Sequence, residues 1–88
     1  MVEEKELAET VERIIRQMEL LINDFSVPKN VRGAIADAKS RLSTKEAYIV
    51  RISSAIYSLD AVSGDINLPP QARTAIWNIL SMLEAIKT

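Results

Sequence analysis

The feature that most constrains this chain is an internal match between residues 24–42 and residues 65–83, at an offset of 41 positions. Self-similarity at a fixed period is typical of chains built from a repeated supersecondary unit. Seven of the 19 aligned positions are identical: Asp24/Asp65, Pro28/Pro69, Arg32/Arg73, Ala34/Ala75, Ile35/Ile76, Ser40/Ser81 and Leu42/Leu83. We therefore predict one domain over residues 1–88 that contains two related units, residues 1–42 and residues 43–88.

The spacing of apolar residues predicts that both units are helical hairpins. In the first unit, apolar side chains recur at intervals of three and four positions, which places them on one face of a helix. The matching positions of the second unit are also apolar. The predicted fold class is all-α, with helices expected over residues 3–23, 27–42, 44–62 and 68–87.

Residues suited to capping mark the expected helix ends. Ser26 and Asn67 occupy equivalent positions and are expected N-caps. Ser43 and Glu46 have the spacing of a capping box, which predicts a helix start near residue 43. Gly64 is expected to end the third helix in a left-handed conformation.

Two hairpins that each bury one face are expected to pack together as a four-helix bundle. The repeat length and the motif Val31-Arg32-Gly33-Ala34 resemble a HEAT-type unit. Solenoids of such units generally need three or more repeats for stability. A closed bundle with a HEAT-like duplication is therefore the favoured architecture.

A wider resemblance rests on the stretches VPKNVRGAIADAKSRL and SSAIYSLDAVSGDINLPPQARTAIWNILSMLE. These resemble a family of short archaeal proteins, about 90 residues long, that is known only as uncharacterised. The most distinctive part is the proline at the start of the second helix of each half, with the arginine that follows it. The resemblance implies an archaeal, cytoplasmic, helical protein, and it brings no activity and no site residues.

Composition narrows the possible chemistry. The chain has no cysteine and no histidine, which excludes disulfides, thiol chemistry, imidazole metal ligands and histidine-based catalysis. The first residues are acidic, unlike a secretory signal, and no run has the roughly 20 apolar residues of a membrane span. We predict a cytoplasmic location, no enzymatic activity, and no catalytic, cofactor or metal site.

A basic segment interrupts a chain whose net charge is only −1. Residues 29–51 contain six bases and two acids, which gives a local charge of +4. Lys29, Arg32 and Lys39 are the candidate anion-binding residues, and they suggest a nucleic-acid-associated accessory protein as the alternative function. No aromatic residue lies between them for base stacking, and acid-rich residues 1–28 could neutralise the segment.

The repeated polar pairs Asp24/Arg32 and Asp65/Arg73 have two interpretations. Each arginine could bind an anion at the start of a helix, where backbone amides are free. Alternatively, each aspartate could tie its loop to the following helix, through the arginine or a helix-start amide. Repetition at one offset favours the structural interpretation, since repeated polar pairs usually serve the repeated fold.

The second half is more apolar than the first. At equivalent positions, polar or small residues of the first half are replaced by apolar or aromatic ones: Glu9/Val50, Arg16/Tyr57, Ala36/Trp77, Lys39/Leu80 and Arg41/Met82. An apolar surplus of this kind often marks an interaction site, and a symmetric dimer is a common way to cover it.

We therefore predict a non-enzymatic protein–protein interaction module that forms a homodimer through its second hairpin, with the following interface residues: Val50, Tyr57, Ala61, Trp77, Leu80 and Met82. An unidentified protein partner is a further possibility. The competing explanation is an asymmetric bundle in which the helices of the second hairpin are central and bury this surplus within one chain.

Overall fold

A computed structural model describes residues 4–87 of the chain. Within this range there is no strand, and four helices account for most of the residues. Their bounds are α1 Glu4–Ile22, α2 Lys29–Leu42, α3 Tyr48–Ser63 and α4 Pro70–Lys87. The prediction of an all-α fold with four helices is confirmed. None of the described helices combines the length and apolar character needed to cross a membrane.

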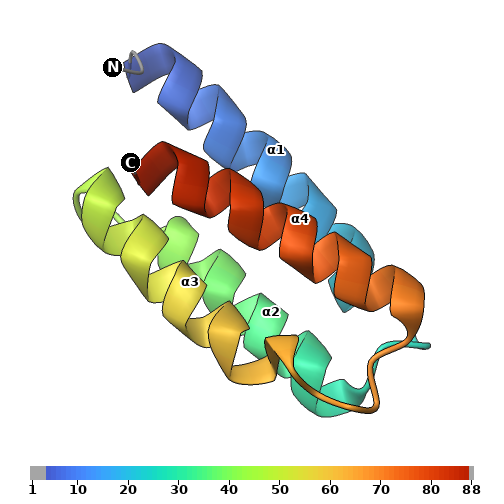
Figure 1. Cartoon of the computed structure of the whole chain (residues 1–88). Helices are drawn as coiled ribbons and strands as arrows, with labels where there is room; N and C mark the ends of the chain where they lie inside the picture. The colour runs from blue at the N-terminus through green and yellow to red at the C-terminus, as the bar shows by residue number, and fades with distance from the viewer. Residues whose placement is uncertain (1–3, 88) are drawn as a thin grey trace.

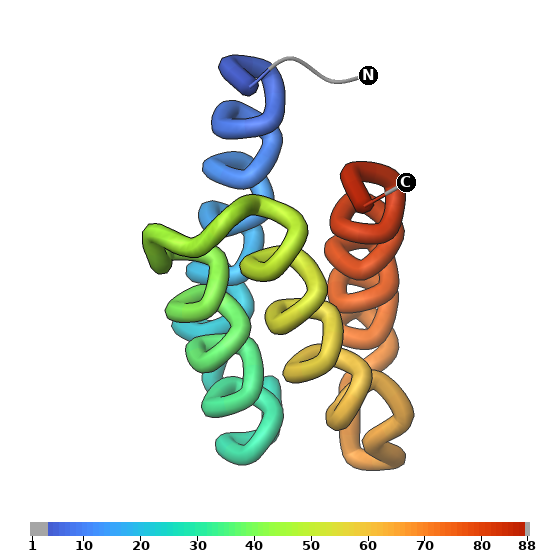
Figure 2. The backbone as a smooth tube through the Cα atoms, turned by 90° about the vertical axis from the view of Figure 1, so that its left-hand side faces the viewer, coloured from blue at the N-terminus to red at the C-terminus, as the bar shows by residue number. Residues whose placement is uncertain are grey.

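The helices form a closed ring (Figures 1 and 2). Each helix lies next to two others, in the order α1, α2, α3, α4 and back to α1, and among the described residues no Cα atoms of the diagonal pairs α1–α3 and α2–α4 come within 8 Å of each other. In a solenoid, the first helices of successive hairpins would stack on each other. The ring is therefore the closed bundle that the sequence favoured.

The core repeats the offset seen in the sequence. Eight pairs of positions separated by 41 residues are buried in both hairpins: Val11/Ile52, Ile14/Ala55, Met18/Leu59, Val27/Leu68, Val31/Ala72, Ile35/Ile76, Ala38/Ile79 and Leu42/Leu83. The two hairpins thus bury equivalent faces against each other. Whether this likeness reflects a duplication stays a prediction.

The loops inside the two hairpins, residues 23–28 and 64–69, lie at the same end of the bundle (Figure 1). They share a pattern of backbone hydrogen bonds at the offset of 41: Val27 N–H donates to Asp24 O at 3.1 Å, and Leu68 N–H donates to Asp65 O at 3.2 Å. The side chain of Asn30 donates to Asp65 Oδ2 at 3.0 Å and so links the two hairpins.

The expected N-caps Ser26 and Asn67 are wrong. Helices α2 and α4 begin later, at Lys29 and Pro70. Pro28 occupies the N-cap position of α2, with extended backbone angles (φ −54°, ψ 145°) and no side-chain cap. The amides of the two expected caps are instead bound by the aspartates two residues before them, which closes a turn ahead of each helix.

The capping box at residues 43–46 is also wrong. Ser43 ends α2, where its hydroxyl donates to Lys39 O at 3.0 Å, and Ala47 is the N-cap of α3. Gly64 does end α3, but with φ −98° it is not left-handed. The Ser43 hydroxyl thus binds at the end of α2 and does not cap the start of α3, because the last carbonyls of a helix also need hydrogen-bond donors.

Candidate functional site

The outer side of α3 carries an apolar stripe. Val50, Tyr57 and Ala61 are spaced by seven and four residues, which aligns them along one side of the helix, opposite its buried face. Tyr57 is 75% exposed, Val50 is 46% exposed, and Ala61 is also exposed. These three predicted interface residues therefore lie together on the surface, where another molecule can reach them.

An open groove runs between α3 and α4. Its lining comes from one residue of α3 and five of α4: Asp60, Trp77, Leu80, Ser81, Glu84 and Ala85. Trp77 is 57% exposed, and it is the large aromatic side chain of this groove. The groove is open to solvent, and both apolar and polar side chains line it.

Leu80 and Met82 belong only in part to this surface. Both are half-buried and pack against the core. Two residues apart on a helix, they point in nearly opposite directions around its axis. Leu80 lines the groove on the α3 side, so Met82 lies on the other flank of α4. The six predicted residues thus divide into an exposed set and two that help to close the core.

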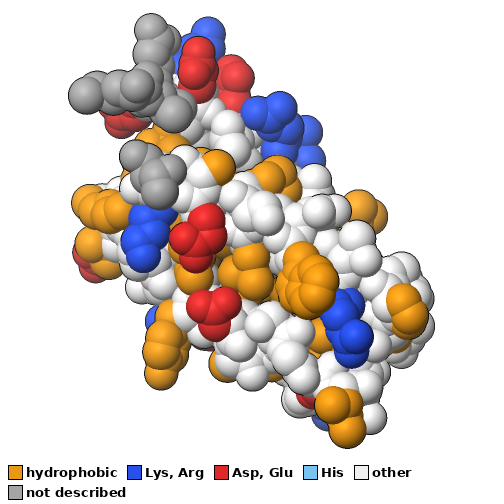
Figure 3. All heavy atoms as spheres, in the orientation of Figure 1, with side chains coloured by type: hydrophobic (Ala, Val, Ile, Leu, Met, Phe, Trp, Pro, Cys, Tyr) orange, Lys and Arg blue, Asp and Glu red, His pale blue; other side chains and the backbone are white. Residues whose placement is uncertain are grey.

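The competing asymmetric bundle predicted that the surplus would be buried within one chain. That holds in part for Leu80 and Met82, whereas Val50 and Tyr57 remain exposed. Figure 3 views the α4 side of the molecule, where hydrophobic side chains form separate patches with acidic groups between them.

Several exposed apolar residues were missed from the sequence. Ile49 is 52% exposed at the start of α3, beside Val50. Phe25 and Ile66 are exposed in the loops inside the two hairpins, and Leu20 is exposed on α1. The loop residues could have been found, because they occupy equivalent positions at the offset of 41.

The candidate anion-binding residues do not form one site. Lys29 and Lys39 lie ten residues apart on α2, which separates them by about 15 Å along the helix axis. Lys39 Nζ lies 3.6 Å from the carboxylate of Glu19 on α1. The Arg32 guanidinium stacks 5.0 Å from the centre of the Phe25 ring. The acidic first helix thus neutralises part of the basic segment.

Two further arginines of the basic segment are engaged within the chain. Arg41 Nε donates to Asp37 Oδ2 at 2.8 Å. Arg51 Nε donates to Glu46 O at 2.6 Å, and its guanidinium lies 4.2 Å from the centre of the Tyr48 ring. In the range that the structure describes, Lys29 and Lys45 are the bases of this segment that remain without such a contact.

The loop aspartates stabilise turns rather than pair with arginines. Neither Asp24/Arg32 nor Asp65/Arg73 is among the ion pairs found within residues 4–87. The Ser26 hydroxyl and amide both donate to Asp24, and these bonds lower the pKa of its carboxyl. For Asp65, donation from the Asn30 side chain and then from the Asn67 amide lowers the pKa.

The arginines reach backbone oxygens instead. Arg32 Nε donates to Val27 O at 3.1 Å, and Arg73 Nη2 donates to Asp65 O at 3.5 Å. The ion pairs are not observed, whereas the alternative of a contact with an amide near the helix start is: the Ser26 and Asn67 amides bind the two carboxylates, together with the side chains of Ser26 and Asn30. The structural role of this pattern is nevertheless observed, because each arginine still joins its helix to the preceding loop.

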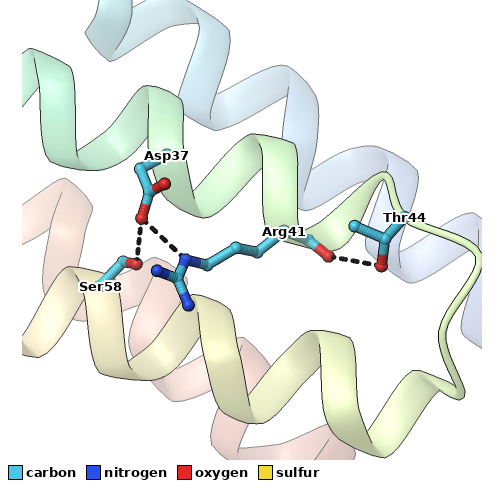
Figure 4. Close-up of polar contacts among 4 residues, drawn as sticks. All are labelled: Asp37, Arg41, Thr44 and Ser58. Atoms are coloured by element: carbon cyan, nitrogen blue, oxygen red, sulfur yellow. Dashed lines mark hydrogen bonds and ion pairs between the residues drawn. The ribbon is translucent and has the colours of Figure 1, made fainter.

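A polar contact between α2 and α3 was not predicted. Asp37 Oδ2 accepts hydrogen bonds from the hydroxyl of Ser58 at 2.6 Å and from Arg41 Nε (Figure 4). These bonds, the one from Ser58 first, lower the pKa of Asp37. Ser58 is buried, and it lies where the two most extensively contacting helices meet. The contact therefore joins α2 to α3.

Among residues 4–87, no three acidic side chains come together in a group that could hold a metal ion. Within those residues no buried side-chain nitrogen or oxygen lacks a hydrogen-bond partner. The candidate functional surface is therefore the set of exposed apolar side chains on the second hairpin.

Comparison with known proteins assigns the chain to a family. A family model described as "Uncharacterised protein family (UPF0147)" matches residues 1–86. The chain belongs to the UPF0147 family. The resemblance inferred from the sequence is thereby confirmed.

Relatives in the UPF0147 family match over most of their length. The UPF0147 protein MJ1419 of Methanocaldococcus jannaschii is 41% identical over 85 residues, which cover 96% of this chain and 91% of the relative. A UPF0147 protein of Sulfurisphaera tokodaii is 38% identical over 78 residues and 88% of each chain. These relatives come from archaea, in agreement with the implied origin.

Two solved structures have the same fold. The protein of unknown function MMP1188 superposes with a TM-score of 0.86 at 40% identity, over 92% of this chain and 93% of that one. A UPF0147 protein from Thermoplasma acidophilum gives a TM-score of 0.84 at 32% identity, over 90% and 94% of the two chains. The four-helix bundle is therefore shared within UPF0147.

Proposed function

We propose that this UPF0147 protein is a non-enzymatic interaction module that self-associates through its second hairpin. The observation that carries the proposal is the uneven distribution of exposed large apolar side chains on the described helices. Four lie on α3 and α4, namely Ile49, Val50, Tyr57 and Trp77, whereas α1 has Leu20 and α2 has none. Large apolar side chains that gather on one part of a protein surface often mark an interaction site, and aromatic anchors are typical of one.

A second copy of the chain is the simplest partner for this surface. A homodimer covers one patch on each subunit with the same patch of the other. The proposal of a non-enzymatic role rests on the use of the polar groups: the buried ones have partners within the fold, and the loop carboxylates close turns. The nucleic-acid alternative has less support, because most of the basic segment contacts other groups of the chain.

The test is the native mass from light scattering, at micromolar to millimolar protein concentrations. We expect a dimer, and we expect Tyr57→Glu to lower the native mass while the helical circular dichroism is retained, because the change places a charge at the centre of the patch. Leu20→Glu is the matched control: Leu20 is equally exposed, at 74%, but lies on the first hairpin.

A monomeric wild type at every concentration would refute the proposal. So would dissociation by Leu20→Glu with no effect of Tyr57→Glu. A shift of native mass on adding mixed RNA, reversed by salt, would favour the nucleic-acid alternative instead.

A further inference from the structure

The α3 stripe has a pattern that suits pairing with its own copy. With Ser54 included, the stripe reads Val50, Ser54, Tyr57 and Ala61, spaced by four, three and four residues. All four lie within about 40° of one line along the helix. Large and small side chains alternate along this line. Such a sequence of knobs and gaps can interlock with a copy of itself that runs in the opposite direction.

We propose that the dimer forms by antiparallel packing of α3 against the partner's α3, with a two-fold axis between residues 55 and 56. This inference rests on the proposed self-association and adds its geometry. In this register Val50 faces the partner's Ala61, and Ser54 faces the partner's Tyr57. Each large side chain then meets a small one, as close helix packing requires. A symmetric interface requires this reciprocity, since the same two contacts occur twice.

The electrostatics of the stripe allow two copies to meet. A charge near a two-fold axis would face its own copy or be buried without a partner, and both are unfavourable. None of the four stripe residues is charged. Of the charged residues beside the stripe, Arg51 is held against the Tyr48 ring and Glu46 O, and Asp60 lines the groove toward α4.

The exposed apolar area approaches the size that a dimer interface needs. A stable interface buries at least about 1,000 Å² in total, or about 500 Å² from each subunit. The exposed parts of Ile49, Val50, Tyr57 and Trp77 amount to roughly 400 Å² for side chains of these sizes. The exposed Ala61 and the half-buried Ser54 add to this area. The two-fold axis places the α4 helices of both subunits on the same side of the α3–α3 interface. Both Trp77 side chains therefore lie on that side.

The register can be tested with two variants that are each defective alone. Val50→Glu and Ala61→Lys change exposed positions, so both chains should keep the helical circular dichroism and melting temperature of a folded monomer. Each should weaken its own homodimer by roughly a hundredfold, because symmetry buries the unpaired charge twice. An equimolar mixture should form a heterodimer, in which the new acid and the new base face each other.

Native mass spectrometry distinguishes the two homodimers from the heterodimer, because the two variant chains differ in mass. Ser54→Lys is the control for register: mixed with Val50→Glu, it should not restore a dimer in the antiparallel seam, whereas a parallel seam would bring the two positions together. Rescue by Ser54→Lys and not by Ala61→Lys would overturn the proposed register. A dimeric wild type that neither Val50→Glu nor Ala61→Lys affects would overturn the α3 seam but leave self-association standing. A wild type that stays monomeric would overturn both.

Discussion

At the scale of single residues, Asp37 illustrates how one exposed carboxylate can connect two helices. It accepts hydrogen bonds from Ser58 on α3 and from Arg41 on its own helix. Hydrogen bonds to a charged acceptor are stronger than those between neutral groups. Because they favour the ionised form, they lower the pKa of Asp37 in the folded protein, with the bond from Ser58 as the main cause.

This lowered pKa predicts how the contribution of Asp37 depends on pH. A carboxyl whose pKa is lower in the folded state stabilises the fold above the pKa of the unfolded chain, near 3.9, and loses that effect as pH falls through the lowered value. Asp37→Asn should therefore reduce the melting temperature at pH 7, and its difference from wild type should shrink below about pH 4.

Melting followed by circular dichroism between pH 7 and pH 2 measures the effect, with Glu9→Gln as a control at an exposed carboxylate of α1. A difference between Asp37→Asn and wild type that is unchanged across this pH range would contradict the expectation. The control should follow wild type throughout.

At the scale of the helices, α2 contains a residue that weakens it without an evident packing reason. Gly33 lies in the exposed middle of the helix, and a methyl group built there would meet no atom within 4 Å. Its φ is not positive, so glycine is not needed for the backbone conformation. Glycine in a helix interior costs up to about 1 kcal/mol relative to alanine.

Gly33→Ala should therefore raise the free energy of unfolding by about 0.5–1 kcal/mol, as measured by urea denaturation. Gly64→Ala is the matched comparison. Because Gly64 ends α3 with a negative φ and open space around it, this change should be neutral or slightly stabilising. A loss of about 1 kcal/mol at Gly64 would instead indicate the left-handed cap that the sequence suggested. A destabilising Gly33→Ala would mean that the outer face of α2 is covered in solution.

At the scale of the whole molecule, stability depends on a thin core to which both hairpins contribute equivalent residues. An 88-residue domain has a net stability of only about 5–15 kcal/mol. Leu42 and Leu83 occupy equivalent positions near the ends of α2 and α4, and both are buried almost completely. If the halves contribute alike, these two leucines should matter to a similar degree.

Leu42→Ala and Leu83→Ala should each lower the free energy of unfolding by about 2–5 kcal/mol, since each leaves a cavity in a closed core. Leu20→Ala, at an exposed leucine of α1, should change it by less than about 0.5 kcal/mol. Chemical denaturation at one protein concentration measures all three. A large effect at one buried leucine and none at the other would show that the halves are not energetically equivalent.

The sequence by itself determined the number of helices, their approximate bounds and the buried face of each, because the spacing of apolar residues is a local property of a helix. It also located the equivalent core positions Leu42 and Leu83 through their offset. It misplaced the starts of α2, α3 and α4, since Ser26, Ser43 and Asn67 have short polar side chains that serve turns and helix ends equally well.

Only the tertiary structure decided which apolar residues of the second hairpin remain exposed to solvent. Leu80 and Met82 enter the edge of the core because α4 has a neighbouring helix on each flank, whereas Tyr57 points away from the ring and remains exposed. The partners of charged residues were decided in the same way: Lys39 meets Glu19 because α1 lies beside α2. Contacts of this kind depend on the order of helices around the ring, and no short stretch of sequence contains that order.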